Sequence, residues 1–171
     1  VMLWRKYANA SDIPLLTDIL QFLLSCIRLQ DKSANTLPER IKEYLDGIKK
    51  TAKANGYVTT LFGRRRKIAE LASSNKNLQH FGERVAMNSP IQGTAADIIK
   101  IAMIKTSNAL KEANIDAKLL LQVHDELILE SHKDDAEKAY EILKNSMEGA
   151  IKLSVPLNVE AHIGKNWYEA K

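Results

Sequence analysis

The sequence predicts an α+β fold, in which helices back one face of an antiparallel sheet. Two short apolar runs, Leu119–Val123 and Glu126–Glu130, are separated by only two residues and therefore predict a hairpin. Longer stretches before and after these runs carry apolar residues at helical spacing. Strands and helices do not alternate regularly, as the crossovers of a parallel sheet would require. Together these observations indicate an antiparallel sheet.

Length and composition are those of one globular domain or of a large fragment of a longer protein. The chain has 171 residues, of which 45% are hydrophobic, so it can bury a sizeable core. Its net charge of +4 is a modest excess that favours a polyanionic partner only slightly. A single cysteine, Cys26, excludes an intrachain disulfide and is typical of a reducing compartment such as the cytoplasm.

An apolar stretch near the N-terminus, Ile13–Leu29, raises the question of a membrane span. It is short for a span and is interrupted by Pro14, Asp18 and Gln21. It is therefore interpreted as a buried helix that needs a protein partner. No small-residue cleavage site follows it, as one would in a signal peptide. We expect a soluble chain with no membrane partner.

Two regions are predicted, with a boundary in the polar residues 30–35. Residues 1–36 form an apolar N-terminal segment, and residues 37–171 form the main domain. The domain opens with a helix, because Pro38 suits a first helical position and Asn55-Gly56 suits a helix end. One face of this helix is apolar through Ile41, Tyr44, Leu45 and Ile48.

The next elements are a strand and two helices. Tyr57–Phe62 is rich in β-branched and aromatic residues and predicts a strand, followed by the loop Gly63–Arg66. Helices are expected over Asn77–Asn88 and over Pro90–Ala113. The second of them begins with Ser89-Pro90-Ile91-Gln92, which has the form of a capping box with Ser89 as N-cap, Pro90 as first and Gln92 as third helical residue.

The C-terminal third continues with the hairpin, a helix and a last strand. His124-Asp125 forms the turn of the hairpin, because His and Asp tolerate left-handed backbone angles better than most residues. Apolar residues at helical spacing predict a helix through Ala136, Tyr140, Leu143 and Met147. Alternating apolar residues predict a half-buried strand through Leu157, Val159, Ala161 and Ile163.

The hairpin tip carries the residues best suited to chemistry. A tight turn between apolar strands would present Asp125 and Glu126 from a rigid platform, and hard carboxylate oxygens suit Mg²⁺. Phosphoryl transfer uses two such metals roughly 3.5–4 Å apart. The alternative is that these residues are polar only because turns face water, and His124 allows the same interpretation.

Five segments in one order then point to a family. They are Gly56-Tyr-Val-Thr-Thr-Leu-Phe-Gly-Arg-Arg-Arg66, Glu83-Arg-Val-Ala-Met-Asn88, Pro90-Ile-Gln-Gly-Thr-Ala-Ala-Asp97, Leu121-Gln-Val-His-Asp-Glu-Leu127 and Ile163-Gly-Lys-Asn-Trp167. In this order and spacing they resemble the palm-region end of family A DNA-directed DNA polymerases, the bacterial polymerase I type. The resemblance implies an enzyme of bacterial cytoplasm, with an organellar source left open, that acts in DNA replication and repair. It assigns residues 37–171 to the polymerase palm.

The resemblance also implies roles for single residues. Asp125 would be the catalytic aspartate, with Glu126 beside it at a Mg²⁺ site, and Gln122 and His124 would lie near the primer end. The partners would be primer–template DNA and deoxynucleoside triphosphates. Residues expected to contact the DNA are Arg64, Arg65, Arg66, Arg84, Asn88 and Gln92.

Residue spacing agrees in part with these DNA contacts. Arg84, Asn88 and Gln92 are four residues apart and form one polar row if a helix continues across Pro90. Such side chains can bind phosphates or minor-groove acceptors without regard to sequence. Two alternatives stay open. Gln92 could instead close the capping box, and residues 64–66 could be a solvated turn.

Residues 1–36 contain neither of two expected parts of such an enzyme. One is a second palm aspartate in an Asp-Tyr-Ser-Gln-type strand, and the other is the cationic fingers helix that binds the nucleotide. The chain alone is therefore expected to be inactive, with a missing polymerase portion as a further partner. An alternative is a noncatalytic DNA-binding module. A phosphohydrolase would need more histidine ligands, and a reverse transcriptase would show paired aspartates at the hairpin.

Overall fold

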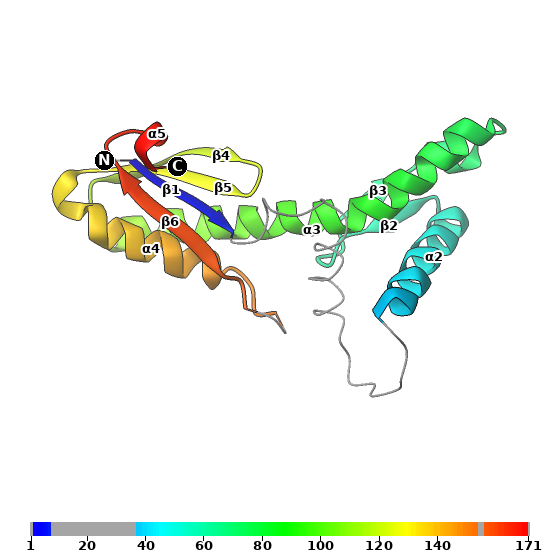
Figure 1. Ribbon diagram of the computed structural model, residues 1–171, viewed down its shortest axis with the longest axis horizontal. Coiled ribbons are helices and arrows are strands. Elements are labelled where there is room, and N and C mark those ends of the chain that lie inside the picture. The colour runs from blue at the N-terminus through cyan, green and yellow to red at the C-terminus, as the bar shows by residue number, and fades with distance from the viewer. Residues whose placement is uncertain (1, 8–36, 154–155, 171) are drawn as a thin grey trace. The chain divides into compact units, whose positions relative to one another are not determined.

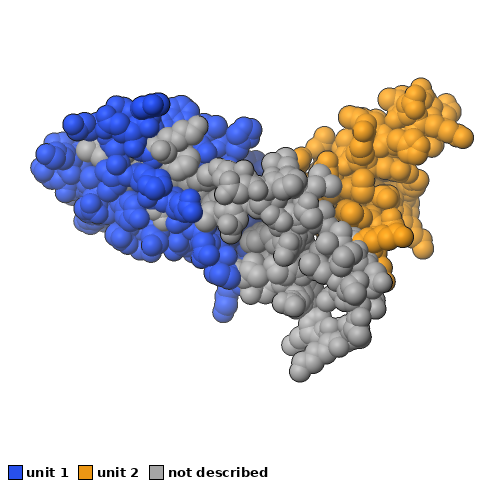
Figure 2. Space-filling model, in the orientation of Figure 1, with its two compact units in different colours: residues 1–13, 96–171 blue, residues 14–95 orange. Residues whose placement is uncertain are grey.

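The computed structural model describes residues 2–7, 37–153 and 156–170. The chain forms two compact units, residues 1–13 with 96–171 (unit 1) and residues 14–95 (unit 2; Figure 2). Helix α3 (Lys76–Glu112) contributes residues to both units. Unit 1 and unit 2 each have their own hydrophobic core. The mixture of helices with antiparallel sheets confirms the predicted α+β class.

Unit 1 is built on a four-stranded sheet in which all neighbours are antiparallel (Figure 1). Its strands, in spatial order, are β4 (Ala117–Val123), β5 (Glu126–Ser131), β1 (Met2–Tyr7) and β6 (Val159–Gly164). β5 and β1 are therefore interior strands, and their register sets Lys6 opposite Glu126. β4 has one register irregularity, between Leu119 and Leu121.

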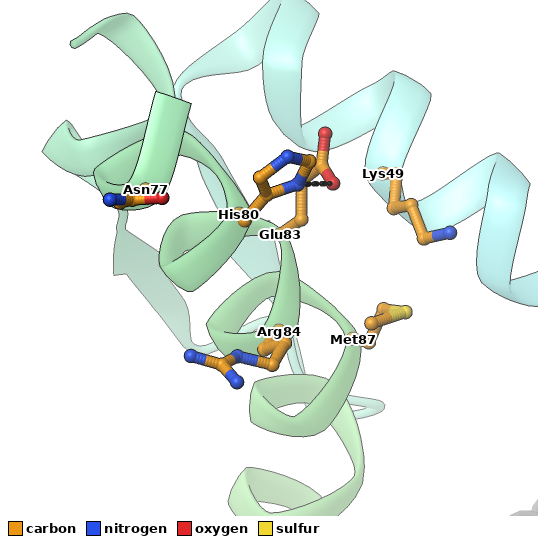
Figure 3. Close-up of a pocket in the computed structure, with 6 residues that line it drawn as sticks. All are labelled: Lys49, Asn77, His80, Glu83, Arg84 and Met87. Atoms are coloured by element: carbon orange, nitrogen blue, oxygen red, sulfur yellow. Dashed lines mark ion pairs between the residues drawn. The ribbon is translucent and has the colours of Figure 1, made fainter. Parts of the chain in front are cut away.

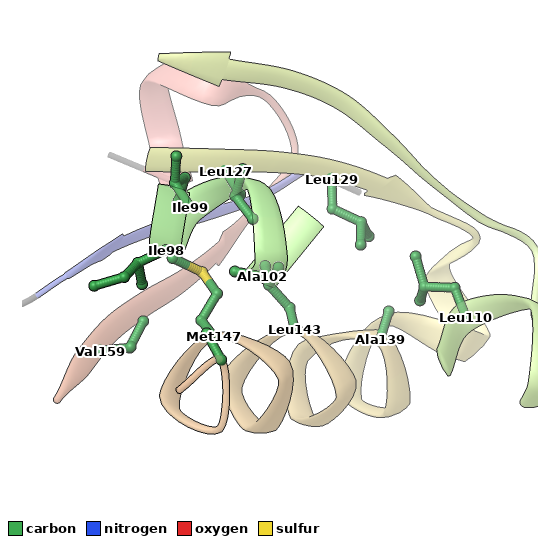
Figure 4. Packing of buried hydrophobic residues seen from close by; sticks show 11 residues of the cluster. Ile98, Ile99, Ala102, Leu110, Leu127, Leu129, Ala139, Leu143, Met147 and Val159 are labelled. Atoms are coloured by element: carbon green, nitrogen blue, oxygen red, sulfur yellow. The ribbon is translucent and has the colours of Figure 1, made fainter. Parts of the chain in front are cut away.

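The core of unit 1 lies between this sheet and two helices (Figure 4). Leu127 and Leu129 of β5 pack with residues of α3 and of α4 (Ala136–Glu148), among them Ala102 and Leu143. Ile128, between them in sequence, faces the other side and packs against α5 (Trp167–Ala170). All three β5 residues are fully buried, so this strand is anchored on both faces. The short 3₁₀ helix η2 (Lys133–Asp135) leads into α4.

Unit 2 packs α2 (Leu37–Asn55) and the N-terminal part of α3 around a two-stranded ribbon. The ribbon consists of β2 (Tyr57–Thr59) and β3 (Arg65–Lys67), and the 3₁₀ helix η1 (Ala69–Ala72) follows it. The buried residues of this core are Ala52, Val58, Ile68, Leu71 and Ala86. α2 ends at Gly56, which has a φ of +73°, so the predicted glycine end of this helix is confirmed.

The predicted break between two helices at Ser89–Gln92 is wrong. α3 is continuous from Lys76 to Glu112 with Pro90 inside it, so no capping box forms. The Ser89 hydroxyl instead donates to the carbonyl of Val85, 2.6 Å away. Pro90 and Ile91 are buried, and packing on both sides of the proline outweighs its loss of one helix hydrogen bond.

The predicted strand Tyr57–Phe62 and loop Gly63–Arg66 are also corrected. The chain turns after Thr60, and Arg65–Lys67 returns as β3, paired with β2. Gly63, with a φ of +81°, allows the turn, and the amide of Arg64 donates to the hydroxyl of Thr60. The other predicted elements of the C-terminal third are confirmed, including the hairpin, α4 and β6.

The N-terminal segment is only partly described. Residues 2–7 form β1, in the same sheet as the C-terminal elements, whereas Ile13–Leu29 lies outside the described residues. The boundary expected near residue 36 also lies there and stays a prediction. Among the helices that the structure describes, none is long and apolar enough to cross a membrane.

Candidate functional site

The β4–β5 hairpin presents two carboxylates next to its turn. Val123 pairs with Glu126, so His124 and Asp125 are the two turn residues. His124 has a φ of +53°, the left-handed angle that such a turn requires of its first residue. Asp125 and Glu126 are half buried, and both have polar interactions within the chain. The predicted hairpin geometry is therefore confirmed, whereas the catalytic roles stay predictions.

Two features hold this turn in place. Its second strand is buried on both faces, as described above. Its first strand also fastens the turn directly, because the side-chain amide of Gln122 donates to the carbonyl of His124. Gln122, expected near the primer end, thus has a clear structural role, and both it and His124 are exposed.

The carboxylates of the turn fit part of a magnesium site. Their oxygens are the hard donors that Mg²⁺ prefers. However, nowhere in residues 2–7, 37–153 and 156–170 do three or more His, Cys, Asp or Glu side chains group so that they could hold a metal. Asp125 and Glu126 therefore supply two ligands of suitable chemistry and not a complete binding site.

The three arginines of the β2–β3 ribbon have different surroundings, although all are exposed. Arg64 turns back onto α3, and its Nη2 donates to the carbonyl of Gly93 at 2.9 Å. The guanidinium of Arg65 lies 4.9 Å above the ring of Tyr57, a cation–π contact. Arg66 pairs with Val58 in the ribbon. Tyr57 is half buried beneath Arg65.

The polar row Arg84, Asn88 and Gln92 lies on one continuous helix, as its spacing predicted for the case without a break at Pro90. Arg84 and Gln92 are exposed and Asn88 is half buried. Next to Arg84 is an open pocket of about 500 Å³ (Figure 3). It is lined by Lys49, Asn77, His80, Glu83, Arg84 and Met87.

An ion pair at this pocket joins α2 to α3. Lys53 Nζ lies 2.5 Å from Glu83 Oε1, and His80 Nδ1 lies 3.5 Å from Glu83 Oε2. The hydrogen bond from Lys53, helped by the charges of Lys53 and His80, lowers the pKa of Glu83 from its usual value. Glu83 is therefore ionised at neutral pH, and the charge of Lys53 neutralises it. The pair adds no net negative charge beside Arg84 that would repel an anionic ligand.

Residues 90–94 of α3 form a set of contacts that sequence reasoning missed. The hydroxyl of Thr94 donates to the carbonyl of Pro90 at 2.6 Å and accepts from the amide of Leu61 at 3.0 Å. A Cβ on Gly93 would lie 2.5 Å from Cγ2 of Thr60, so only glycine allows this approach. Gly93-Thr94 inside an otherwise helical pattern was the available signal.

The structure groups the predicted residues by unit. The arginines of the ribbon and the polar row belong to unit 2, whose elements bring Arg64 against the helix that carries Gln92. Gln122, His124, Asp125 and Glu126 gather at one hairpin tip in unit 1.

Comparison with known proteins gives a consistent family. Residues 31–169 match the model of DNA polymerase family A. DNA polymerase I of Caldicellulosiruptor bescii is 53% identical over 132 residues, 77% of this chain and 16% of that protein. DNA polymerase I of Geobacillus stearothermophilus is 53% identical over 175 residues, 98% of this chain and 20% of that protein. The latter alignment takes in most of residues 1–36, the segment expected to be unmatched.

A solved structure agrees with this result. It is the POL domain of Pol1 from M. smegmatis in complex with DNA primer–template and dNTP. The two structures share 27% sequence identity with a TM-score of 0.78, over 99% of this chain and 40% of that one. The chain spans about a fifth of the length of the Geobacillus relative. From the motifs, the fold and these matches, the chain belongs to DNA polymerase family A.

Proposed function

We propose that this chain is the palm-region part of a DNA-directed DNA polymerase. In the complete enzyme it would serve template-directed transfer of a nucleotide from a deoxynucleoside triphosphate to a primer 3′ end, in replication and repair. The observation that carries the proposal is the two-residue hairpin that presents Asp125 and Glu126 from a strand buried on both faces. Preorganised acidic turns of this kind suit phosphoryl transfer, whose catalysis is mostly positioning and electrostatics.

Asp125 and Glu126 would hold Mg²⁺ together with ligands from the rest of the enzyme. Polymerases of this family are in general metal-dependent, and the metal stabilises charge on the reacting phosphoryl oxygens. Gln122 would keep the turn in shape through its bond to the His124 carbonyl, and the exposed His124 ring would be free to face the primer end.

The basic ribbon and the polar row would grip primer–template DNA. Arg65 and Arg66 are exposed on a short ribbon, and Arg84 and Gln92 are exposed on a rigid helix. Arginine and amide side chains on regular elements can bind phosphates and minor-groove acceptors without reading sequence. A POL domain similar in structure was solved with primer–template DNA and dNTP, which supports these ligands for the family.

We further propose that the 171-residue chain does not extend a primer by itself. Two metals need carboxylates from more than one strand. β5 lies between β4, its partner in the hairpin, and β1. The residues of β1, Met2-Leu-Trp-Arg-Lys-Tyr7, contain no acid, and Lys6 lies opposite Glu126. Among the described residues, neither strand beside β5 therefore supplies a second palm aspartate. The sequence also shows no motif of a fingers helix to hold the triphosphate.

Extension of a labelled primer with all four nucleotides and Mg²⁺ tests both statements. The purified chain should give no extension. In a complete polymerase that contains this segment, Asp125→Asn should abolish extension, with Asp116→Asn as a matched control on the surface of the same unit. Template-dependent extension by the chain that is lost in Asp125→Asn would refute its inactivity. A complete enzyme that stays fully active with Asp125→Asn would refute the hairpin assignment.

A noncatalytic DNA-binding module is the second candidate. The exposed Arg65, Arg66 and Arg84 favour it, because such side chains can bind phosphates without any chemistry at the hairpin. The two candidates differ in one result, since a module would bind the duplex but would not restore extension to a polymerase lacking this segment. Complementation of that kind would favour the enzyme part.

A further inference from the structure

Pro90 interrupts the hydrogen bonds of α3 in the middle of the polar row. Proline has no N–H, so the carbonyl of Ala86 loses its usual helix donor, which weakens a helix at this point. Arg84 and Asn88 precede the proline and Gln92 follows it. Any change of helix geometry at Pro90 would therefore turn Gln92 away from the other two residues.

The turn Thr60–Arg64 is bonded to α3 at this weak point. It closes through the amide of Gly63, which donates to the Thr60 carbonyl at 3.0 Å. From this turn, the Leu61 amide donates to Thr94 Oγ1 at 3.0 Å and Arg64 Nη2 donates to the Gly93 carbonyl at 2.9 Å. Both bonds reach the first helical turn after the proline.

Thr94 is the centre of these contacts. Its hydroxyl accepts from the Leu61 amide and donates to the Pro90 carbonyl at 2.6 Å. It therefore links the turn to the segment of α3 that contains the proline. The side chain is 3% exposed, and the neighbouring Thr60 is also buried. A buried hydroxyl with two partners is far more sensitive to removal than a solvated one.

We propose that the turn Thr60–Arg64 is a clamp that holds α3 straight enough across Pro90 to keep Gln92 in line with Arg84 and Asn88. Thr94 is then a positioning residue for DNA binding, and Arg64 acts through α3 as well as through its own charge. This role rests on the proposed DNA-binding function of the row.

Two variants separate the hydroxyl from the bulk of the side chain. Thr94→Val keeps the shape but removes both hydrogen bonds, whereas Thr94→Ser keeps the hydroxyl. Leu61→Pro removes the amide donor on the turn side, and its ring, in place of the donated hydrogen, also pushes the turn away from Thr94 Oγ1. Circular dichroism and thermal unfolding of the full chain check that each variant folds.

The first readout is hydrogen exchange of the amides of residues 91–94 without DNA. Thr94→Val and Leu61→Pro should raise exchange there by about tenfold, and Thr94→Ser should stay near wild type. Pro90→Ala, which restores the helix donor, should cancel the increase. Unchanged exchange in folded Thr94→Val and Leu61→Pro refutes the clamp, whatever the DNA assay shows.

The second readout is affinity for a primer–template duplex in a double-mutant cycle. Gln92→Ala should lower affinity by about fivefold in the wild-type background and by less than about twofold with Thr94→Val. Equal losses in both backgrounds would refute the positioning role. If Gln92→Ala and Arg84→Ala have no effect in wild type, the proposed DNA contact fails instead, and the exchange result still decides the clamp.

Discussion

Glu83 carries its charge between two helices, and its pH response can be predicted from its partners. The pKa of Glu83 is lowered in the folded chain by Lys53 and, secondarily, by His80. A carboxyl whose pKa is lowered in the folded state stabilises the fold at pH values above its ordinary pKa of 4.5. This contribution is lost as the pH falls through the lowered pKa of the folded state. Glu83→Gln should therefore lower the free energy of unfolding at pH 7 and lower it less at pH 3.

Urea denaturation at several pH values measures this difference. Lys53→Met is the matched control, because Glu83→Gln should cost less in a background that lacks the main partner. A Glu83→Gln effect that is the same at pH 3 and pH 7 would show that the residue acts through packing and not through its charge.

The contacts of the β2–β3 ribbon predict different effects for substitutions of its three arginines. Alanine at both Arg65 and Arg66 should weaken duplex binding evenly across sequences. It should also reduce the slope of log K against log salt by about 0.9 for each phosphate that the variant no longer binds. Arg64→Ala should in addition raise hydrogen exchange at residues 91–94, because Arg64 bonds to Gly93.

Titration of a labelled primer–template at increasing salt gives these slopes. Lys118→Ala, an exposed cation outside the ribbon, is the control. Binding that does not depend on salt, or that persists unchanged after all three arginines become alanine, would contradict the role of the ribbon.

Local signals in the sequence were enough for some elements and not for others. The glycine end of α2 and the His124-Asp125 turn were predictable, because one or two residues decide the backbone angles there. The continuous α3 was not predictable, because Pro90 is a strong local stop signal. The helix continues through Pro90 because contacts between distant residues stabilise it, such as the hydrogen bond between Leu61 and Thr94, 33 residues apart.

For the whole molecule, the sheet order predicts a large effect of the N-terminal segment. β1 lies between β5 and β6, and β6 has no other strand neighbour in the described sheet. Removal of residues 1–36 should therefore leave unpaired backbone groups on both sides, which changes solubility or association state. Light scattering and circular dichroism of the shortened chain measure the outcome.

A second variant separates β1 from the apolar stretch that follows it. Replacing residues 8–36 by a Gly/Ser linker of equal length keeps β1 and removes Ile13–Leu29. It should preserve the sheet if β1 is what matters. A chain without residues 1–36 that keeps wild-type solubility, mass and circular dichroism would show that the segment is dispensable.

The long-range part of the architecture could not be predicted from patterns. Met2–Tyr7 has no distinctive spacing, and its place between two C-terminal strands follows from pairing across more than a hundred residues. The candidate residues were chosen from local motifs, and the structure gives their places on the hairpin, the ribbon and α3, whereas their roles stay predictions. The structural roles of Gln122 and Arg64 could not be predicted from the sequence. Their hydrogen-bond partners are backbone carbonyls, of the hairpin turn for Gln122 and of helix α3 for Arg64.

The placement of the two tryptophans gives the chain a built-in optical signal. Trp4 and Trp167 both belong to unit 1, and residues 14–95 contain no tryptophan. The indole nitrogen of Trp167 is buried and finds no hydrogen-bond partner within the described chain, in an apolar setting beside Ile128. Emission excited at the tryptophan band therefore reports on unit 1 alone. Loss of structure in that unit can thus be followed in an unlabelled sample, whatever happens in unit 2.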